Sequence, residues 1–373
     1  MQKIRVLVVD DAVVVRRMVA DTIATDPDLE VAGTAANGRI ALAKLTQLNP
    51  DLVVMDVEMP DMDGLETLKA MRQRQPRLPV IMFSTLTERG ALATLEALTL
   101  GANDYVTKPA NAGSVGLALQ RLREELLPKI KALCPHLIRR KPLLPRHPPG
   151  PGAAEIPPPP PQPAICPTLA RGPLHPVEIL AIGVSTGGPS ALAELLTDLP
   201  AGFPVPVVIV QHMPALFTKL LAERLNDKSA LKIRECLAGE VLRPGQVWIA
   251  PGGQHMVVER HGGQVRLGTH QEAPENSCRP AVDVLFRSVV KAYGGGTLAL
   301  VLTGMGQDGL RGCELIHHAN GQILTQDKAS SVVWGMPGAV TQAGLADMVL
   351  PLNQLAPEIM RRVRPEDARA NSL

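Results

Sequence analysis

Proline is distributed unevenly along this 373-residue chain, and this limits what the chain can fold into. Fifteen of its 35 prolines lie between Pro135 and Pro176, five of them in the unbroken run Pro157–Pro161. Proline fixes φ and removes a backbone donor, so we expect an extended, polyproline-II-rich linker here. Two globular blocks flank this stretch. We predict a domain over residues 1–127, a linker over 128–176, a second domain over 177–362 and a tail over 363–373.

The composition excludes several classes of protein. Hydrophobic residues make up 45% of the chain and charged residues 20%, as in globular domains that bury a core. A net charge of +2, with two Trp, two Tyr and four Phe, gives neither the basic surface nor the stacking platform of a nucleic-acid-binding protein. No segment approaches the roughly 18 uncharged apolar residues that span a bilayer. We therefore expect no nucleic-acid partner and no membrane insertion.

Two smaller features of the composition bear on location and partners. The five cysteines are scattered and form no Cys-x-x-Cys pair, which argues against a disulfide framework or a zinc knuckle; they are Cys134, Cys166, Cys236, Cys278 and Cys313. We expect a cytoplasmic monomer. The start of the linker is basic, which fits solvated charge or, alternatively, a docking site for an acidic partner; its basic residues are Arg139, Arg140, Lys141 and Arg146.

Aliphatic runs alternate with amphipathic stretches in the first block, which predicts a doubly wound parallel sheet. The predicted strands are Ile4–Val9, Leu52–Met55, Val80–Phe83 and Tyr105–Val106. The predicted helices are Arg16–Ile23, Arg39–Leu48, Gly64–Arg74, Gly90–Leu100 and Ser114–Leu127.

The second block follows a similar pattern, so we assign the chain to the α/β class, with two doubly wound, mostly parallel-sheet domains. Its predicted strands are Glu178–Gly183, Val205–Gln211, Gln246–Ala250, His255–Glu259, Gln264–Leu267, Thr297–Thr303, Gln322–Thr325 and Asp347–Leu350. The turn His261-Gly262-Gly263 predicts an antiparallel hairpin that interrupts the parallel order.

Polar residues follow the strands of the first block, at the sheet edge where open α/β sheets bind ligands. Asp10 and Asp11 follow the strand Ile4–Val9, Asp56 follows Leu52–Met55, Ser84 follows Val80–Phe83, and Lys108 comes just after Tyr105–Val106. Grouped carboxylates repel one another unless a cation neutralises them, and oxygen-only ligation suits Mg²⁺. An alternative for each acid taken singly is a helix cap.

These residues together resemble the receiver domain of bacterial response regulators, over about residues 1–127. The matching segments are Val8-Val9-Asp10-Asp11, Asp56-Val57-Glu58-Met59-Pro60 with Gly64, Ser84, and Tyr105-Val106-Thr107-Lys108-Pro109. One departure is Ala12, where relatives often carry Ser.

The resemblance implies roles for the residues of this first site. Asp56 is the expected phosphorylated residue, with Lys108 contacting the phosphoryl group. Asp11 and Asp56 are the expected Mg²⁺ ligands, joined by Asp10 through water and by the Glu58 carbonyl. Ser84 and Tyr105 fall at the switch positions.

The second block contains the segment Gly183-Val184-Ser185-Thr186-Gly187, which matches the G-x-S-x-G pattern of a nucleophile elbow. A nucleophilic serine needs a base and an acid that orients it, and His212 and Asp308 each come just after a predicted strand. The alternatives are a Gly-rich turn with a capping serine, and a structural histidine. The order Ser, His, Asp differs from that of α/β-hydrolases.

Gly304-Met305-Gly306-Gln307-Asp308-Gly309 also satisfies a dinucleotide-binding pattern, with Asp327 at the end of the next strand. Its position late in the domain and the polar helix that follows argue against this interpretation. A dinucleotide-dependent oxidoreductase nevertheless stays open as an alternative, as does a protein that only binds partners when phosphorylated.

The second block resembles the catalytic domain of chemotaxis protein-glutamate methylesterases, over about residues 177–362. The matching segments are 183–188, 211–214, 250–253, 279–286, 304–309 and 335–337. The resemblance implies Ser185 as nucleophile, His212 as general base and Asp308 as its orienting acid, with Thr186 and Met305 in the oxyanion region. The departures are Val184, Ala281 and Cys278, where relatives often carry Ala, Ser and His.

The two resemblances imply a phosphorylation-regulated esterase that hydrolyses glutamate γ-methyl esters on chemoreceptors, releases methanol and deamidates glutamine. The expected partners are a chemotaxis histidine kinase as phosphodonor and methyl-accepting receptors as substrates. Mg²⁺ is expected in the receiver domain and no cofactor in the esterase site. We also expect the receiver to restrain the esterase by covering its strand-end cleft.

Overall fold

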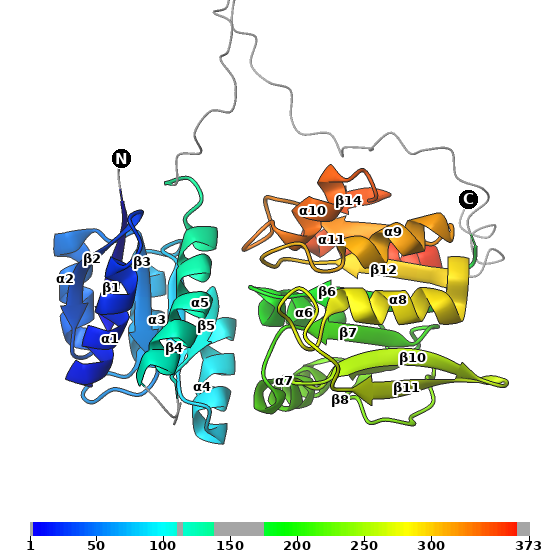
Figure 1. Cartoon of the computed structure of the whole chain (residues 1–373), viewed down its shortest axis with the longest axis horizontal. Coiled ribbons are helices and arrows are strands. Elements are labelled where there is room, and N and C mark those ends of the chain that lie inside the picture. Colours follow the sequence, from blue (N-terminus) through cyan, green and yellow to red (C-terminus); the bar gives the residue numbers. More distant parts are fainter. Residues whose placement is uncertain (1–2, 110–114, 138–174, 364–373) are drawn as a thin grey trace, which may run out of the picture.

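The computed structural model of the chain describes residues 3–109, 115–137 and 175–363. Most of the predicted linker, with its proline run and basic residues, lies outside this range. So do the predicted helix start Ser114, Cys166 and the tail from residue 364. Two α/β domains make up the described part (Figure 1).

The first domain is a parallel sheet of five strands in the order β2-β1-β3-β4-β5, with helices on both faces. Its strands are β1 (Ile4–Val9), β2 (Leu29–Ala35), β3 (Leu52–Asp56), β4 (Val80–Ser84) and β5 (Asp104–Thr107). Its helices are α1 (Val13–Ala24), α2 (Gly38–Leu48), α3 (Gly64–Arg74), α4 (Glu88–Thr99) and α5 (Val115–Leu133).

Successive side chains along each strand point to opposite faces of the sheet, so this domain has one part of its core on each face. Val6 and Val8 belong to one buried cluster with residues of α1 and α5. Leu7 and Val9 belong to a second cluster with residues of α2, α3 and α4. Both faces are covered, which explains why the strands read as continuous apolar runs.

Two elements of this domain differ from the sequence prediction. The edge strand β2 was not predicted, because its residues are mostly half-exposed and form no apolar run. Helix α5 continues six residues past its predicted end at Leu127, through Pro128. Ile130 and Leu133 on this extension are buried against the sheet, and that packing outweighs the helix bond that proline removes.

The second domain is a seven-stranded sheet in the order β14-β13-β12-β6-β7-β9-β8, in which all strand pairs are parallel. Its strands are β6 (Ile179–Val184), β7 (Val207–Gln211), β8 (Lys232–Glu235), β9 (Gln246–Ile249), β12 (Thr297–Val301), β13 (Gln322–Gln326) and β14 (Met348–Leu350). Its helices are α6 (Gly188–Thr197), α7 (Ala215–Lys228), α8 (Val282–Tyr293), α9 (Leu310–His318), α10 (Met336–Gln342) and α11 (Leu352–Val363).

The predicted antiparallel hairpin exists, but it does not interrupt the parallel order. Its strands β10 (His255–His261) and β11 (Gln264–His270) form a separate two-stranded sheet. Met256, Val258 and Leu267 of this hairpin are buried in the same cluster as Leu285 and Phe286 of α8. The hairpin thus packs on a helix. The edge strand β8 was not predicted from the sequence. Only one of its four residues is buried, so it forms no apolar run.

Each sheet has one position where the strand order reverses, and open α/β sheets bind ligands there. In the first domain this position lies between β1 and β3, which end at the predicted acidic site. In the second domain it lies between β6 and β12, directly before Ser185 and Thr303.

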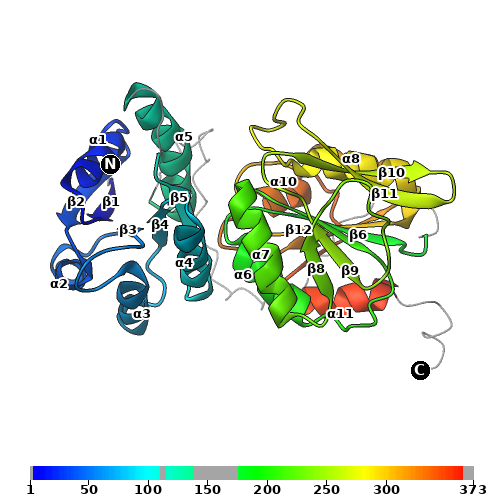
Figure 2. The ribbon, with the colours of Figure 1, turned by 90° about the horizontal axis from the view of Figure 1, so that it is seen from below.

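The two domains contact each other through α4 of the first and through α6 and α7 of the second (Figure 2). One buried apolar cluster runs from the α2–α4 face of the first sheet to the α6–α7 face of the second. In the described ranges, no helix has both the length and the apolar character to cross a membrane.

Candidate functional site

The predicted acidic residues of the first domain lie together. Carboxylate oxygens of Asp10, Asp11 and Asp56 lie within 4.8 Å of one another. Asp10 and Asp56 are buried, and the Lys108 ammonium contacts both, at 2.9 Å and 2.8 Å. A cavity of about 310 Å³ opens beside them, lined also by Glu58. An oxygen-only donor set of this kind fits a hard cation such as Mg²⁺.

Electrostatics distinguish Asp56 from the other acids. Burial raises the pKa of Asp56 to about 6, with a further rise caused by Asp10, while the bond with Lys108 opposes both. The carboxylate is therefore poorly solvated, and a divalent cation would restore its charged, nucleophilic form.

Neither of the two predicted switch residues is among those that line the acidic cavity. The Ser84 hydroxyl donates to the Gly90 carbonyl at the start of α4. The Tyr105 ring is buried against Phe217 of α7, with ring centroids 4.6 Å apart. Tyr105 thus connects the edge of the first sheet to the second domain.

Ser185 lies in a tight turn between β6 and α6. Its N–H donates to the Thr303 carbonyl, and Gly187 has φ +79, a conformation that suits glycine. A Cβ on Gly304 would lie 2.9 Å from the Ser185 Cβ, so the neighbouring loop needs glycine there. The turn therefore holds a half-buried serine at the end of the sheet.

His212 and Asp308, predicted as base and orienting acid, are hydrogen-bonded with His212 Nε2 2.8 Å from Asp308 Oδ2. Asp308 also accepts bonds from the N–H groups of Val282 and Asp283, the first two residues of α8, and from the Asn276 amide. Burial alone raises the pKa of Asp308, but these bonds outweigh it and keep the pKa below its usual value. Asp308 is therefore a fixed anion.

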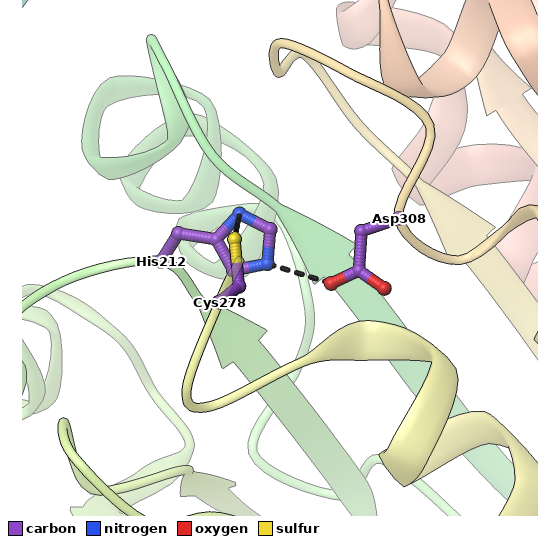
Figure 3. A group of neighbouring side chains, drawn as sticks. All are labelled: His212, Cys278 and Asp308. Atoms are coloured by element: carbon purple, nitrogen blue, oxygen red, sulfur yellow. Dashed lines mark hydrogen bonds and ion pairs between the residues drawn. The ribbon is translucent and has the colours of Figure 1, made fainter. Parts of the chain in front are cut away.

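The other ring nitrogen of His212 faces a thiol. Cys278 Sγ lies 3.6 Å from His212 Nδ1 (Figure 3). Burial lowers the pKa of His212, but the bonds with Asp308 and Cys278 outweigh it and raise the pKa to about 9. Within the part of the chain that the structure describes, no hydrogen bond joins the Ser185 hydroxyl to His212, although both line one cavity.

The residues of the predicted oxyanion region surround the same turn. No hydrogen bond within the described residues uses the N–H of Thr186 or of Gly187, so both are available to an oxyanion. The Thr186 hydroxyl donates to Asp104 of the first domain at 2.6 Å, and this contact is buried. Met305 is 37% exposed at the rim.

The glycine-rich segment 304–309 is arranged for this site and not for a dinucleotide. The Gly304 carbonyl accepts bonds from the N–H groups of Gly335 and Met336, and Asp308 turns inward to His212. The Asp327 carboxylate, expected at a ribose in the alternative interpretation, caps a local turn through Ser330.

Sequence reasoning missed three residues that contact this site. Asp104 comes from the other domain, and Asn276 lies in a loop with φ +53. Cys278 had been noted only as a departure from the family pattern. A polar residue inside the short strand β5 was the one available signal for Asp104.

The fold and the two sites define a class: a receiver domain followed by an α/β domain with a serine, histidine and aspartate at its strand ends. The family model for CheB methylesterase matches residues 180–359, and that for the response regulator receiver domain matches residues 6–120.

Relatives cover the whole chain. A protein-glutamate methylesterase/protein-glutamine glutaminase of Trichodesmium erythraeum is 54% identical over 97% of this chain and 100% of its own length. One from Nocardioides sp. is 53% identical over 100% of both. The crystal structure of the Thermotoga maritima CheB methylesterase catalytic domain is 40% identical, covering 50% of this chain and 98% of that one, with a TM-score of 0.49. This chain belongs to the protein-glutamate methylesterase/protein-glutamine glutaminase family.

Proposed function

We propose that this protein hydrolyses glutamate γ-methyl esters on chemoreceptors, releasing methanol, and deamidates glutamine, in bacterial chemotaxis adaptation. The hydrogen bond between His212 and the buried anion Asp308, beside Ser185, carries the proposal. Full-length similarity to named methylesterase/glutaminases supports it. Methanol release from membranes that carry methylated receptors is the direct test.

In the proposed reaction, Ser185 Oγ attacks the ester carbonyl while His212 Nδ1 takes its proton. The N–H groups of Thr186 and Gly187 stabilise the oxyanion. The tetrahedral intermediate then expels methanol, which takes its proton from His212. Water, deprotonated by His212, hydrolyses the glutamyl ester on Ser185 and regenerates the hydroxyl. Asp308 holds the imidazole throughout.

Proton transfer to His212 gives this reaction a defined pH dependence. The base must be neutral, and a pKa of about 9 leaves His212 protonated at lower pH. We expect kcat/KM for methanol release to rise with pH, by about 10-fold per unit, until it levels near pH 9. In Asp308→Asn the profile should move to lower pH, because the carboxylate that raises the pKa is gone. A flat profile below pH 9 in the unchanged chain would contradict the role of His212.

The receiver domain covers the esterase site in the proposed resting state. The cavity that holds Ser185 and His212 has a volume of about 30 Å³ and is lined also by Asp104, Tyr105 and Lys129 of the first domain. That volume takes one or two water molecules, not a glutamyl methyl ester. Substrate can therefore enter only after the receiver moves.

Phosphorylation at Asp56 is the proposed trigger for this movement. Tyr105 lies two residues before the end of β5, and Lys108 follows that strand and contacts Asp56. A phosphoryl group pulling on Lys108 would shift β5, and with it the stacking on Phe217. Mg²⁺ held by Asp10, Asp11, Asp56 and the Glu58 carbonyl would supply charge neutralisation for the phosphoryl transfer.

Weakening the cover should activate the unphosphorylated chain. We expect Asp104→Ala, and a fragment beginning near Val177, to release methanol roughly 5- to 150-fold faster, the usual range of allosteric coupling. The Asp104 carboxylate accepts a hydrogen bond from the Thr186 hydroxyl. The Lys129 ammonium lies 3.3 Å from the same carboxylate and holds it in place. Asp21→Ala, an exposed acid on α1, is the control and should leave the rate unchanged. Equal rates for all four proteins would refute the proposal that the receiver domain covers the esterase site. They would favour a receiver that serves to recruit the enzyme to its partners.

The proposal also includes its setting. The phosphodonor is a chemotaxis histidine kinase and the substrates are methyl-accepting receptors. We propose a cytoplasmic monomer, which suits the free thiols of Cys134, Cys236, Cys278 and Cys313.

A further inference from the structure

The thiol of Cys278 lies against the one nitrogen of His212 that can act as a base. Nε2 is bonded to Asp308, which leaves Nδ1 to accept the proton of Ser185, and Sγ lies 3.6 Å from Nδ1 (Figure 3). Cys278 reaches this position from the loop before α8, and Asn276 in the same loop is bonded to Asp308. Any group that becomes bonded to the sulfur therefore lies next to Nδ1, the nitrogen of His212 that acts as the general base.

Cys278 differs from the other cysteines that the structure describes. Cys134, Cys236 and Cys313 are buried, and burial raises the pKa of each thiol, to about 12 for the first two. Such thiols are inert. Cys278 is partly exposed and has an imidazole beside it, the setting in which protein thiols react.

The two groups lie close enough for a proton to pass between them. When Sγ gives its proton to Nδ1, the products are a thiolate and an imidazolium, which attract each other in a site where His212 is 12% exposed. The high pKa of His212 agrees with a stabilised imidazolium. The thiolate is the nucleophilic form of cysteine.

We propose that Cys278 is a redox-modification site at which a peroxide oxidant switches off the esterase. The thiolate attacks one peroxide oxygen, an S–O bond forms, the O–O bond breaks, and the leaving hydroxide takes the proton of the imidazolium. Sulfur is oxidised to a sulfenic acid and peroxide is reduced to water. The S–OH group donates to Nδ1 and occupies the lone pair that the Ser185 proton needs. A thiol reductant reverses the change.

This site goes beyond the proposed function, and its test includes a readout that does not depend on turnover. The full-length chain is treated with hydrogen peroxide in the presence of dimedone, and the labelled peptides are identified by mass spectrometry. We expect the adduct on Cys278 and none on the three buried cysteines. In His212→Gln, the adduct on Cys278 should form more slowly, because no imidazole takes the thiol proton.

The second readout is methanol release after peroxide treatment without dimedone. We expect the rate of the unchanged chain to fall about 100-fold, the lower end of what a positioned base contributes, and to recover with dithiothreitol. Cys278→Ala should retain its own untreated rate after peroxide. Cys236→Ala, which removes a buried thiol, should lose activity as the unchanged chain does.

Three results would overturn the inference. One is an adduct on Cys278 that forms no faster than on Cys236, and another is adduct formation without loss of the methanol-release rate. The third is loss of rate in Cys278→Ala equal to that in the unchanged chain. A chain that releases no methanol before peroxide treatment, even with a small phosphodonor and Mg²⁺ present, would instead refute the proposed function. The comparison of dimedone labelling between the unchanged chain and His212→Gln would then still show whether Cys278 is a reactive thiol.

Discussion

Ser185→Ala should release methanol from methylated receptors at least about 1,000-fold more slowly than the unchanged chain, since the serine is the proposed nucleophile that forms the covalent intermediate. His212→Ala should lower the rate of methanol release by a similar factor. Both variants should keep the far-ultraviolet circular dichroism of the unchanged chain, and Ser185→Ala should also keep its thermal transition, whereas His212→Ala should unfold at a lower temperature because the buried Asp308 loses a hydrogen-bond partner. Ser185 is half-buried, so the loss of one hydroxyl group there removes little packing.

Residues that act as one unit lose activity non-additively. The double variant Ser185→Ala, His212→Ala should therefore be about as active as either single variant. A double variant far below both would show that the two residues act independently. Methanol release retained in Ser185→Ala would remove the nucleophile assignment itself.

Asp56→Asn should abolish labelling by a small phosphodonor in the presence of Mg²⁺, and with it any stimulation of methanol release. Asp56 is buried, contacts Lys108 at 2.8 Å and shares its site with two further acids. The amide keeps the shape of the side chain but has no nucleophilic oxygen. The measurement is incorporation of phosphoryl label together with the methanol-release rate.

Asp61→Asn provides a matched control for this substitution. Asp61 is an exposed acid at the same end of the sheet, with φ +65, a conformation that asparagine tolerates. This variant should be labelled as the unchanged chain is. If Asp56→Asn were labelled to the same level, and the label were acid-stable, the phosphoacceptor assignment would be wrong.

Apolar strands could be predicted from the sequence, at the centre of a sheet and at two of its edges (β5 and β14), while the polar edge strands β2 and β8 could not. Ile4–Val9 matched β1 residue for residue, because both faces of that strand are covered and all its positions except Arg5 are apolar. Strands β2 and β8 lie at sheet edges and alternate polar with apolar residues over short lengths. The end of α5 was wrongly predicted at Leu127, before Pro128, since the burial that stabilises the rest of the helix depends on packing against the sheet.

The site residues divide in the same way. Asp56, Ser185 and His212 follow parallel strands, and parallel strands bring their ends to one edge, so the sequence order already implied proximity. Cys278 lies 66 positions from His212, in the long loop between the hairpin strand β11 and α8, and nothing in the local pattern indicates their contact. The bond between Asp104 and Thr186 depends on how two domains dock, which no single-domain pattern specifies.

The proposed cover belongs to the same polypeptide as the site it closes. A tethered partner acts at an effective concentration on the order of millimolar, fixed by the chain and independent of dilution. A separate inhibitor with the modest affinity that a reversible switch needs would dissociate at cellular concentrations. With the inhibitor built in, the fraction of closed enzyme is the same whether a cell makes few copies or many. If the proposed cover operates through contacts such as that between Asp104 and Thr186, the covalent tether makes the resting rate per molecule independent of expression level, and only phosphorylation changes that rate.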